Sequence, residues 1–522
     1  MAAIDFFDQG WRKNPDGAAY VLGERAYTFQ EIRDLSCQIS HALIATGSAP
    51  ETKVAVWSLN DPIAWTCVLA TWRGGMTWVP VNPRSSSDDN AHILDAFDCE
   101  ILFFQRGFAE VIDAIRPQLP KLKHAICLEE ALAGTRSLQQ FIDGHPTTPP
   151  VVDHGMDDVV MLGPTGGTTG LPKGVMNTNR NIATFFAQWS MTASYRPDDP
   201  VVNLAAAPMT HTAGNVSLPA TARGGTVVIL EKPDPAAILE AIEQRRVTEL
   251  FLPPTVIYML LDYPGVEQRD FSSLRYFMYG AAPMSLEKLR QAIDVFGPVM
   301  MEGYGQMEAF ASIAYLAPEE HFVDGHLAPD GQLSSCGRPA ALTNVMISDE
   351  ANQALPPGQS GEICVRGDIV MKGYYKAPDK TAETIIDGWL HTGDIGHLDD
   401  RGYLHLTDRK KDMIISGGFN VYPSEVEQVI WSHPAVLDCA VIGVPDDKWG
   451  EAVKAVVELN SGMQVEAAEL LALCRERLGG VKTPKSIDFV DQLPRSANGK
   501  VLKKALRQPG QTIAAQRYYK RS

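Results

Sequence analysis

The period of apolar positions switches repeatedly in the first half of the chain. In residues 27–47 apolar side chains recur at helical spacing, with Thr28 and Glu31 as a capping box and Gly47 as the stop. Short apolar runs at 54–58, 77–81 and 100–104 predict buried strands, and 62–72 predicts a helix between the first two. The order strand, helix, strand returns over 224–230, 235–246 and 249–254, so we expect an α/β fold with helix-covered sheets.

The sequence pattern changes near Cys336. From there on, short β-like segments alternate with turns, which predicts a β-rich subdomain. After Asp412, helices and strands form a further mixed unit of about 110 residues, a common domain size. We therefore expect a large N-terminal domain, residues 1–410, built from two helix-covered β-sheet subdomains and the β-rich subdomain. A small α+β C-terminal domain, residues 411–522, completes the predicted fold.

Composition narrows the class of protein. The chain has 522 residues, 45% of them hydrophobic, and a formal net charge of −17, which argues against a general nucleic-acid binder because such proteins need a basic surface. Its eight cysteines show no paired spacing, which favours buried, reduced thiols. The first residues contain no basic flank followed by an apolar segment, and no apolar run reaches membrane-spanning length, so we expect a cytoplasmic protein without an integral membrane segment.

One segment, PTGGTTGLPKGV at residues 164–175, has the composition of an anion cradle. Neighbouring glycines let main-chain N–H groups converge on a phosphate, the threonines add hydroxyl donors, and Lys173 adds positive charge. The apolar run before it would place this loop after a strand. A flexible surface loop is the alternative interpretation. The segment is not a Walker-type P-loop, because Gly174 follows the lysine where that motif requires serine or threonine.

Eight motifs in this order resemble the adenylate-forming superfamily of acyl-CoA synthetases, luciferases and carrier-protein-loading adenylation domains. The resemblance covers nearly the whole chain. The matching pieces are PTGGTTGLPKGV (164–175), PMTHTAG (208–214), GAAP (280–283), EGYGQMEA (302–309), CGRP (336–339), GWLHTGDIG (388–396), DRKKDMIISGGFNVYPSEVE (408–427) and LPRSANGKVLKKALR (493–507).

The resemblance implies an enzyme that joins a carboxylate to the α-phosphate of ATP, releases pyrophosphate, and passes the acyl group from AMP to a thiol. Such chemistry depends on positioning and on cations that neutralise phosphate charge. Glu308 matches the family's magnesium-associated carboxylate, although by itself it would be taken for a solvated carboxylate at a helix start. The residues implied to hold the phosphates are Thr165, Gly166, Gly167, Thr168, Thr169, Gly170 and Lys173.

Other matches imply a nucleoside site. Tyr304, next to Gly305, would stack on adenine. Asp394 matches the carboxylate that accepts hydrogen bonds from the ribose hydroxyls, and Arg409 the basic residue that also reaches the ribose; a turn-capping aspartate and a surface ion pair are the alternatives. The wall opposite Tyr304 would be Gly280, Ala281 and Ala282.

The C-terminal unit carries the remaining implied roles. Lys500 matches the lysine that bridges the carboxylate and the α-phosphate during adenylation; out of context it would be a solvated surface residue. Lys411 aligns with the hinge about which the small domain rotates between the two half-reactions. Rotation would present Gly417 and Gly418 beside the channel for the pantetheine arm of coenzyme A.

The acyl-binding pocket is the least determined part of the site. His211 stands where the family places a histidine or aromatic residue at the pocket mouth, so it either gates the carboxylate or fills the core. Neither it nor its neighbours supply the aspartate with which amino-acid-activating relatives bind an ammonium group, which favours an acid without an α-amino group. The predicted lining contains small residues and no charged one, which favours a fatty or aryl monocarboxylic acid. The predicted lining is His211, Thr212, Gly214, Asn215, Pro254, Thr255, Ala281, Gly303 and Gly305.

Three positions depart from the family pattern. Gly167 stands where many relatives have serine, and residues 177–181 lack the histidine common just after the loop. Met307 replaces the usual threonine, so a hydroxyl expected near the α-phosphate is missing and adenylation could be slower or differently arranged.

The leading hypothesis is an AMP-forming acid:CoA ligase that uses ATP, Mg²⁺ and coenzyme A, with catalytic roles for Lys500, Glu308 and His211. An enzyme that loads a carrier protein and a noncatalytic nucleotide-binding relative are the alternatives. No carrier domain is evident in the sequence, which favours free coenzyme A, and the retention of Glu308 and Lys500 disfavours a noncatalytic role. We expect small-molecule partners and no nucleic acid. The sequence leaves open whether the protein forms a homodimer.

Overall fold

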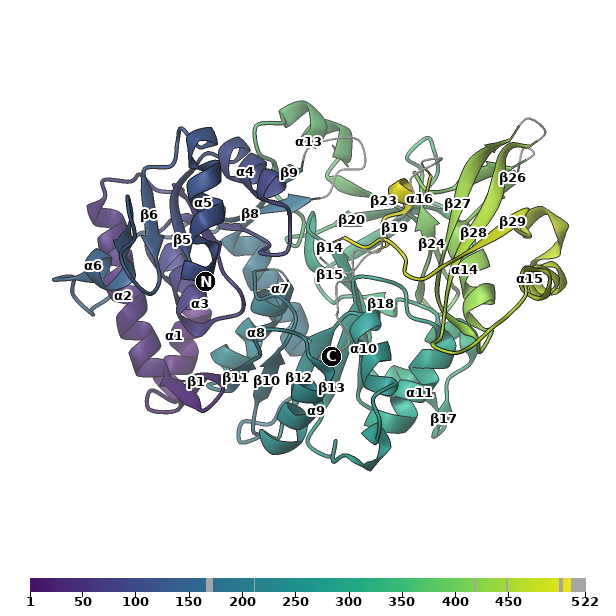
Figure 1. The fold of residues 1–522 in the computed structure, drawn as a ribbon, viewed down its shortest axis with the longest axis horizontal. Coiled ribbons are helices and arrows are strands. Elements are labelled where there is room, and N and C mark those ends of the chain that lie inside the picture. Colours follow the sequence, from purple (N-terminus) through teal and green to yellow (C-terminus); the bar gives the residue numbers. More distant parts are fainter. Residues whose placement is uncertain (166–171, 211, 417–418, 447–448, 497–500, 508–522) are drawn as a thin grey trace.

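Two large mixed sheets form the body of the protein (Figure 1). The computed structural model describes residues 1–165, 172–210, 212–416, 419–446, 449–496 and 501–507. The first sheet has the strand order β21-β9-β8-β4-β3-β5-β6-β7. Its strands are β3 (Lys53–Trp57), β4 (Thr77–Pro80), β5 (Cys99–Phe104), β6 (His124–Cys127), β7 (Arg136–Ser137), β8 (Val159–Thr165), β9 (Lys173–Thr178) and β21 (Gly373–Tyr374).

The second sheet has the order β18-β15-β14-β13-β12-β10-β11-β1-β2. From β11 to β14 its neighbouring strands are parallel, whereas β14 and β15 form an antiparallel pair. Its strands are β1 (Ala18–Leu22), β2 (Arg25–Thr28), β10 (Val202–Ala205), β11 (Thr226–Ile229), β12 (Glu249–Leu252), β13 (Tyr276–Gly280), β14 (Met300–Gln306), β15 (Ala309–Leu316) and β18 (Arg338–Pro339).

Helices cover both faces of these sheets. The largest apolar core lies between the two sheets, where it includes side chains of α1 (Ala3–Lys13), α2 (Phe29–Ala45), α3 (Pro62–Arg73), α7 (Asn179–Thr192) and α8 (Thr212–Ala222). A second core joins the nine-stranded sheet to α9 (Pro235–Gln244), α10 (Pro254–Leu261) and α11 (Leu286–Phe296). A third joins the eight-stranded sheet to α4 (Ser87–Ala96) and α5 (Ala109–Ile115). The short α6 (Leu138–Ile142) follows β7.

Local signals explain where several of these helices begin. At α2 the Thr28 and Glu31 side chains each accept from the other's backbone N–H, which is the predicted capping box. At α3 the Asp61 carboxylate accepts from two first-turn amides, and Pro62 occupies a position that needs no N–H partner. Arg73 at the end of α3 is buried and forms a bidentate ion pair with Asp8 of α1, with N–O distances of 2.9 and 2.7 Å.

The predicted β-rich subdomain is a separate five-stranded sheet. It contains β19 (Asn344–Ser348), β20 (Gly361–Arg366), β22 (Ile385–Ile386), β23 (Trp389–Leu398) and β24 (Leu404–Arg409). The short helix α13 (Pro378–Thr384) contacts this sheet. Three further small elements, β16 (Phe322–Val323), β17 (His326–Leu327) and α12 (Asp330–Leu333), follow the nine-stranded sheet's β15 in the chain, and Phe322 and Leu333 pack in the second core.

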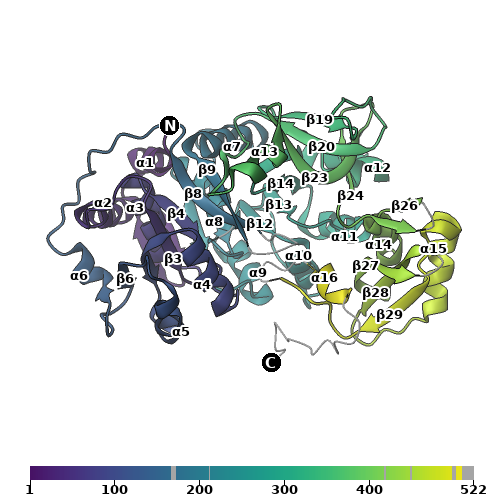
Figure 2. The ribbon, with the colours of Figure 1, turned by 90° about the horizontal axis from the view of Figure 1, so that it is seen from above.

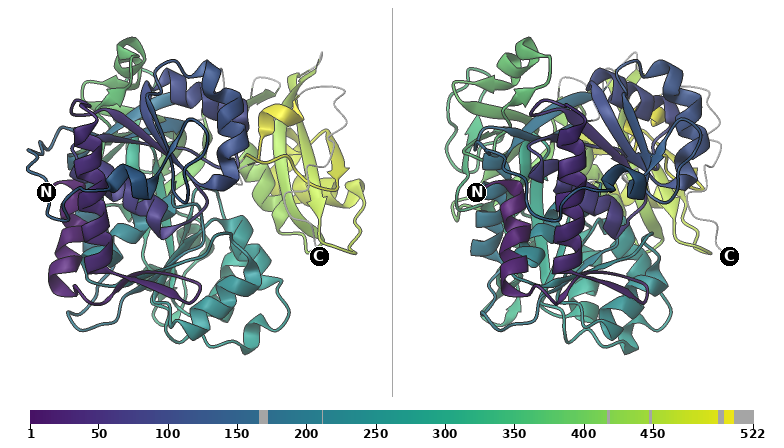
Figure 3. Two further views of the ribbon diagram at one scale, coloured as in Figure 1. Left: turned by 60° about the vertical axis from the view of Figure 1, so that its left-hand side comes forward. Right: turned by 90° about the vertical axis from the view of Figure 1, so that its left-hand side faces the viewer.

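The last part of the chain forms its own α+β unit beside the large domain (Figure 2). Its sheet is β25 (Ile414–Ser416), β26 (Phe419–Val421), β27 (Val436–Asp446), β28 (Gly450–Leu459) and β29 (Ser486–Val490). Its helices are α14 (Pro423–Trp431), α15 (Ala467–Lys482) and α16 (Lys503–Leu506), and its core is separate from those of the large domain. The two views in Figure 3 show this unit packed against one side of the large domain.

The fold predicted from the pattern is confirmed. The runs at 54–58, 77–81 and 100–104 correspond to β3, β4 and β5, and the residues 27–47 helix corresponds to α2. All eight cysteines lie in the described part of the chain, and each is a buried, free thiol. Within the described ranges, no helix combines the length and apolar character needed to cross a bilayer.

Candidate active site

Asp394 and Tyr304 meet where the β-rich subdomain touches the end of the nine-stranded sheet. The Tyr304 hydroxyl donates to Asp394 Oδ2 at 2.7 Å, and Arg409 Nε lies 3.2 Å from Asp394 Oδ1. Asp394 and Arg409 are directly opposite each other on the antiparallel strands β23 and β24. Asp394 is buried and belongs to a strand, so the alternative of a turn-capping aspartate is wrong.

The electrostatics of this cluster keep the Tyr304 hydroxyl protonated. Burial and the adjacent Asp394 charge raise the pKa of Tyr304 well above its usual value, so its hydroxyl remains a donor. A carboxylate oxygen has two lone pairs, so it can accept more than one hydrogen bond. A ligand with two neighbouring hydroxyl groups matches that capacity.

Close backbone contacts shape the wall beside Tyr304. A Cβ atom on Gly280 would lie 2.4 Å from the carbonyl oxygen of Gly303, and one on Gly305 would lie 2.5 Å from that of Ala311. Ala281, which follows β13, has a φ of 65°, in the left-handed region that a residue with a side chain rarely adopts. The strained residue and the tight spacing mark this turn as a functional-site candidate. Ala282 follows Ala281 in the same turn and is partly buried.

Glu308 lies in the tight turn that joins β14 to β15, not at a helix start. Gln306 pairs with both Ala309 and Phe310, so the turn contains a β-bulge, a feature that commonly re-aims side chains next to active sites. The Tyr374 hydroxyl donates to Glu308 Oε1 at 2.9 Å. The Lys173 ammonium lies 4.5 Å from the centre of the Tyr374 ring, so one tyrosine contacts both a carboxylate and a cation.

Thr165 and Lys173 are paired across β8 and β9, where β8 ends and β9 begins. The prediction that the phosphate loop follows a strand is confirmed, since β8 ends at Thr165. Several predicted site residues lie outside the described part of the chain: Gly166, Gly167, Thr168, Thr169, Gly170, His211, Gly417, Gly418 and Lys500. Their roles stay predictions.

The described residues predicted for the acyl pocket fall in four places, one of which is Ala281 after β13. Thr212 begins α8, Pro254 begins α10, and Gly303 lies on β14. A Cβ on Gly303 would make only ordinary contacts, 3.5 Å or more from Met278 and Tyr315, whereas one on Gly214 would lie 2.2 Å from the Met209 carbonyl oxygen. Gly214 therefore serves close packing against Met209. The predicted lining role of Gly214, Asn215 and Thr255 is not tested by these contacts.

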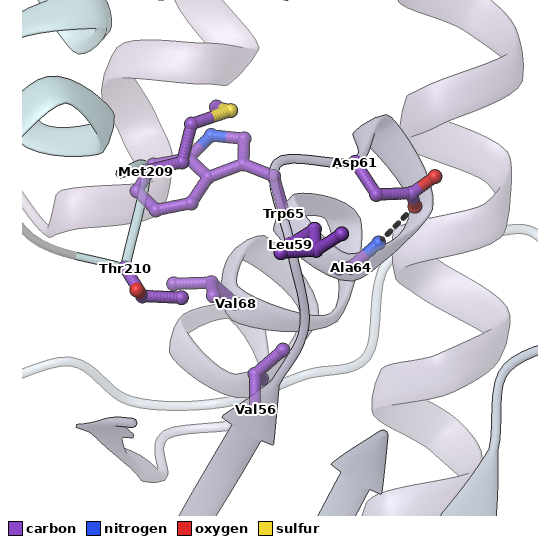
Figure 4. Close-up of a pocket in the computed structure, with 8 residues that line it drawn as sticks. All are labelled: Val56, Leu59, Asp61, Ala64, Trp65, Val68, Met209 and Thr210. Carbon is purple, nitrogen blue, oxygen red and sulfur yellow. Dashed lines mark hydrogen bonds between the residues drawn. The ribbon is translucent and has the colours of Figure 1, made fainter. Parts of the chain in front are cut away.

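A small apolar hollow lies beside the chain that leads to residue 211 (Figure 4). Its only ionisable side chain is Asp61, whose carboxylate is occupied by the amides that start α3, as the dashed line to Ala64 shows. The hollow therefore offers apolar surface and no free charge. Its lining residues are Val56, Leu59, Asp61, Ala64, Trp65, Val68, Met209 and Thr210.

Two of the sequence departures have a structural context. The Met307 thioether packs over β8, because a Cβ on Gly163 would lie 2.6 Å from Met307 Sδ. At residues 177–181, Thr178 and Asn181 form the capping box of α7, and Asn181 Nδ2 also donates to the carbonyl oxygens of Asp368 and Val370 at 2.8 Å each. The segment that replaces the family histidine therefore has its own packing role.

Glu302 is a titratable residue near the site that the sequence analysis did not single out. It is partly buried on β14 and paired with Tyr279 of β13, to which it is hydrogen-bonded. Desolvation raises the pKa of the Glu302 carboxyl to about 8. The Tyr279 hydroxyl also lies 3.3 Å from Nε2 of His321, whose pKa burial lowers to about 4.

The residues present fit a magnesium ion that is shared with a substrate. The described part of the chain contains no cluster of three or more histidine, cysteine, aspartate or glutamate side chains arranged to hold a metal. Mg²⁺ usually takes one or two protein carboxylates and completes its shell with water and substrate phosphates. Glu308, held by Tyr374 through one oxygen, could supply one such ligand.

Two family models match this chain. The model described as AMP-binding enzyme matches residues 7–375, and the one described as AMP-binding enzyme C-terminal domain matches residues 425–500. The chain therefore belongs to the AMP-binding enzyme family, and it is an adenylate-forming enzyme of the acyl-CoA synthetase superfamily.

Individual relatives agree with this assignment. A medium/long-chain fatty-acid–CoA ligase from Mycobacterium tuberculosis is 37% identical, over 95% of this chain and 88% of that protein. A feruloyl-CoA synthase from an Amycolatopsis species is also 37% identical, over 95% of this chain and 96% of that protein. Among solved structures, the amide bond synthetase McbA from Marinactinospora thermotolerans superposes with a TM-score of 0.87 at 31% identity, covering 97% of this chain and 99% of that one.

The close contact at Gly280 gives a first prediction. Gly280→Ala should lower the free energy of unfolding by about 1–3 kcal/mol, because its methyl group collides with the Gly303 carbonyl oxygen. Gly303→Ala should stay near wild type, since its methyl group meets only ordinary contacts. Urea unfolding of both variants would measure these free energies. Equal destabilisation by the two substitutions would show that the close approach to the Gly303 carbonyl oxygen is not the reason for a glycine at position 280.

The raised pKa of Glu302 gives a second prediction. Between the ordinary value of 4.5 and about 8, the folded protein keeps a proton that the unfolded chain releases, so this residue makes stability fall as pH rises through that window. The Glu302→Gln variant cannot titrate at this position and lacks this loss of stability. The melting temperature of the variant minus that of the wild type should therefore increase between about pH 5 and about pH 9. Thermal denaturation of both proteins over a series of pH values would measure this difference in melting temperature. A difference that does not change with pH would contradict the raised pKa of Glu302.

Proposed function

We propose that this enzyme is an AMP-forming carboxylic acid:CoA ligase that activates a fatty or aryl acid. The observation that carries the proposal is the grouping of Tyr304, Asp394 and Arg409, in which a buried carboxylate suited to ribose hydroxyls lies next to an aromatic ring suited to a flat base. ATP and coenzyme A would be co-substrates, and Mg²⁺ would bind with the nucleotide.

In the first half-reaction, a carboxylate oxygen of the acid attacks the α-phosphorus of ATP. The bond to the β-phosphate breaks, and pyrophosphate leaves with the electron pair. Lys173 and the loop from Thr165 would hold the β- and γ-phosphates, and Lys500 would neutralise the approaching carboxylate. Bound Mg²⁺ would supply charge neutralisation on the phosphates, and Glu308 would hold it. Tyr304 would fix the base, and Asp394 and Arg409 the ribose.

In the second half-reaction, the sulfur of coenzyme A attacks the acyl carbonyl carbon, the thiol proton is lost, and AMP leaves with the electrons of the broken bond. We assign the domain division to residues 410 and 411, with Lys411 as hinge. The Ser424 backbone N–H, in the first turn of α14, donates to Asp408 Oδ2 of β24 at 2.8 Å across this division. Rotation about Lys411 would exchange that contact for others and bring Gly417 and Gly418 to the thiol channel.

The acid is proposed to be a monocarboxylate without an α-amino group. Gly303 leaves space on β14, and the hollow beside Met209 has apolar walls without a free charge. His211 would stand at the pocket mouth, with Thr212, Asn215, Pro254, Thr255 and Ala281 among its neighbours. The 37% identical relatives named for fatty and feruloyl acids support the same class of substrate.

Pyrophosphate release tests the proposal. We expect the purified protein with ATP and Mg²⁺ to release pyrophosphate with one class of acid from a panel of short, medium, long-chain, aryl and amino acids, and to consume coenzyme A with the same acid. Release without consumption of coenzyme A would favour carrier-protein loading. No release with any acid, even when ATP binds, would favour a noncatalytic nucleotide-binding role.

The lysine assignment makes a separate prediction. Lys500→Ala should reduce acyl-adenylate formation by at least about 100-fold, in the range lost when a single transition-state charge partner is removed. Thioester formation from a supplied acyl-adenylate should stay near wild type, because the lysine would have left the site by then. Adenylation at the wild-type rate would reject this role of Lys500.

A further inference from the structure

We propose that Tyr374 is a positioning residue that holds Glu308 and Lys173 apart and aims both at the triphosphate of ATP. The inference rests on the proposed function, because it assigns Glu308 to the cation and Lys173 to the phosphates. It concerns a side chain that no motif in the sequence points to.

The contacts of Tyr374 with the two charged residues differ in kind. Its hydroxyl donates to Glu308 Oε1 at 2.9 Å, while the ring face lies 4.5 Å from the Lys173 ammonium. Within the described ranges, neither Lys173 nor Glu308 forms an ion pair with another side chain.

This arrangement keeps two opposite charges available to a ligand. A direct ion pair between Lys173 and Glu308 would neutralise both groups and would have to be broken before either could bind. The contact between the aromatic ring and the ammonium is weak, so a phosphate can compete for Lys173. The hydroxyl contacts only one oxygen of Glu308, so it does not block the other oxygen from acting as a ligand.

The backbone around Tyr374 is fixed on two sides. Tyr374 pairs with Val175 of β9, the strand that begins at Lys173, and the Tyr375 N–H donates to the Gly174 carbonyl oxygen at 2.8 Å. On the other side, the Met371 N–H donates to the Glu308 carbonyl oxygen at 2.9 Å. The segment therefore connects the phosphate hairpin to the Glu308 turn by main-chain hydrogen bonds.

Two side-chain anchors hold the ends of the same segment. Asn181 of α7 binds the carbonyl oxygens of Asp368 and Val370 at its start. At its end, Asp98 accepts from the Tyr375 hydroxyl at 2.6 Å and forms an ion pair with Lys376 at 2.5 Å. With both ends tied, the position of Tyr374 is set by the fold and does not depend on its contacts with Glu308 and Lys173.

Tyr374→Phe tests the proposal, because it removes the hydroxyl and keeps the ring. The matched control is Tyr403→Phe: Tyr403 also donates to a glutamate, Glu320 Oε1 at 3.3 Å, and also has a cation over its ring, the Arg338 guanidinium at 4.4 Å. Binding of ATP to the full chain should be measured by calorimetry, with Mg²⁺ and with EDTA.

Tyr374→Phe is expected to weaken ATP binding only when Mg²⁺ is present. In Tyr374→Phe the enhancement of ATP affinity by Mg²⁺ should fall about ten-fold, as is typical when a hydrogen-bond partner of a metal ligand is lost. ATP affinity in EDTA should stay within about two-fold of wild type, and Tyr403→Phe should change neither value. In a Glu308→Gln background, Tyr374→Phe should have no further effect, because the ligand that it positions is already lost.

Other outcomes would overturn the proposal. Tyr374 would have only a packing role if Tyr374→Phe weakened ATP binding equally with and without Mg²⁺. The same conclusion would follow if Tyr403→Phe weakened Mg²⁺-dependent ATP binding as much, or if the effects of Tyr374→Phe and Glu308→Gln were additive. A wild type that binds ATP no better with Mg²⁺ would remove the role of Glu308 and the inference with it. A wild type that binds ATP with Mg²⁺ but releases no pyrophosphate would reject the proposed reaction alone, since the binding comparison still decides on Tyr374.

Discussion

The buried carboxylate of Asp394 is the constraint on which the arrangement of this site depends. Burial of a charge is costly unless partners compensate it, and here the partners come from two different substructures. Tyr304 belongs to the nine-stranded sheet and Arg409 to the β-rich subdomain, so the same carboxylate ties the two together. Since β24 ends at Arg409, the predicted hinge at Lys411 begins where this fixed cluster stops.

The second constraint is the close approach of backbone segments. Gly280 and Gly303 bring β13 and β14 so near that a methyl group on Gly280 would meet a carbonyl oxygen. The β-bulge at Gln306 then turns Glu308 toward the segment that carries Tyr374. Tyr304, proposed to bind the base, lies on β14, and Glu308, proposed to bind the metal ion, lies in the turn that follows this strand, so the sheet sets the distance between them.

The sequence predicted the features that depend on residues close together in the chain. The capping box at Thr28 and Glu31 and the apolar runs of β3 and β5 involve neighbouring residues, and the structure contains them where they were expected. Motif resemblance located Asp394 and Arg409, although only the pairing of β23 with β24 explains why they meet.

Long-range contacts could not be predicted in this way. Tyr374 is 66 residues from Glu308 in sequence, and their hydrogen bond follows from the pairing of β21 with β9, for which a two-residue strand gives no periodic signal. The alternative interpretation of Glu308 as a helix-start carboxylate was wrong because the bulged turn between β14 and β15 has no helical pattern to detect. The raised pKa of Glu302 likewise comes from burial in the folded protein, which the neighbouring sequence does not reveal.

The central claim is that one site carries out both half-reactions through an acyl-adenylate. A single-turnover experiment tests it most directly: enzyme in excess over ATP is mixed with the acid identified by pyrophosphate release, quenched over time, and analysed by mass spectrometry before and after coenzyme A is added. We predict that acyl-AMP accumulates without coenzyme A and converts to acyl-CoA and AMP when it is added. Formation of ADP and phosphate, or of acyl-CoA without a preceding acyl-AMP, would contradict the account.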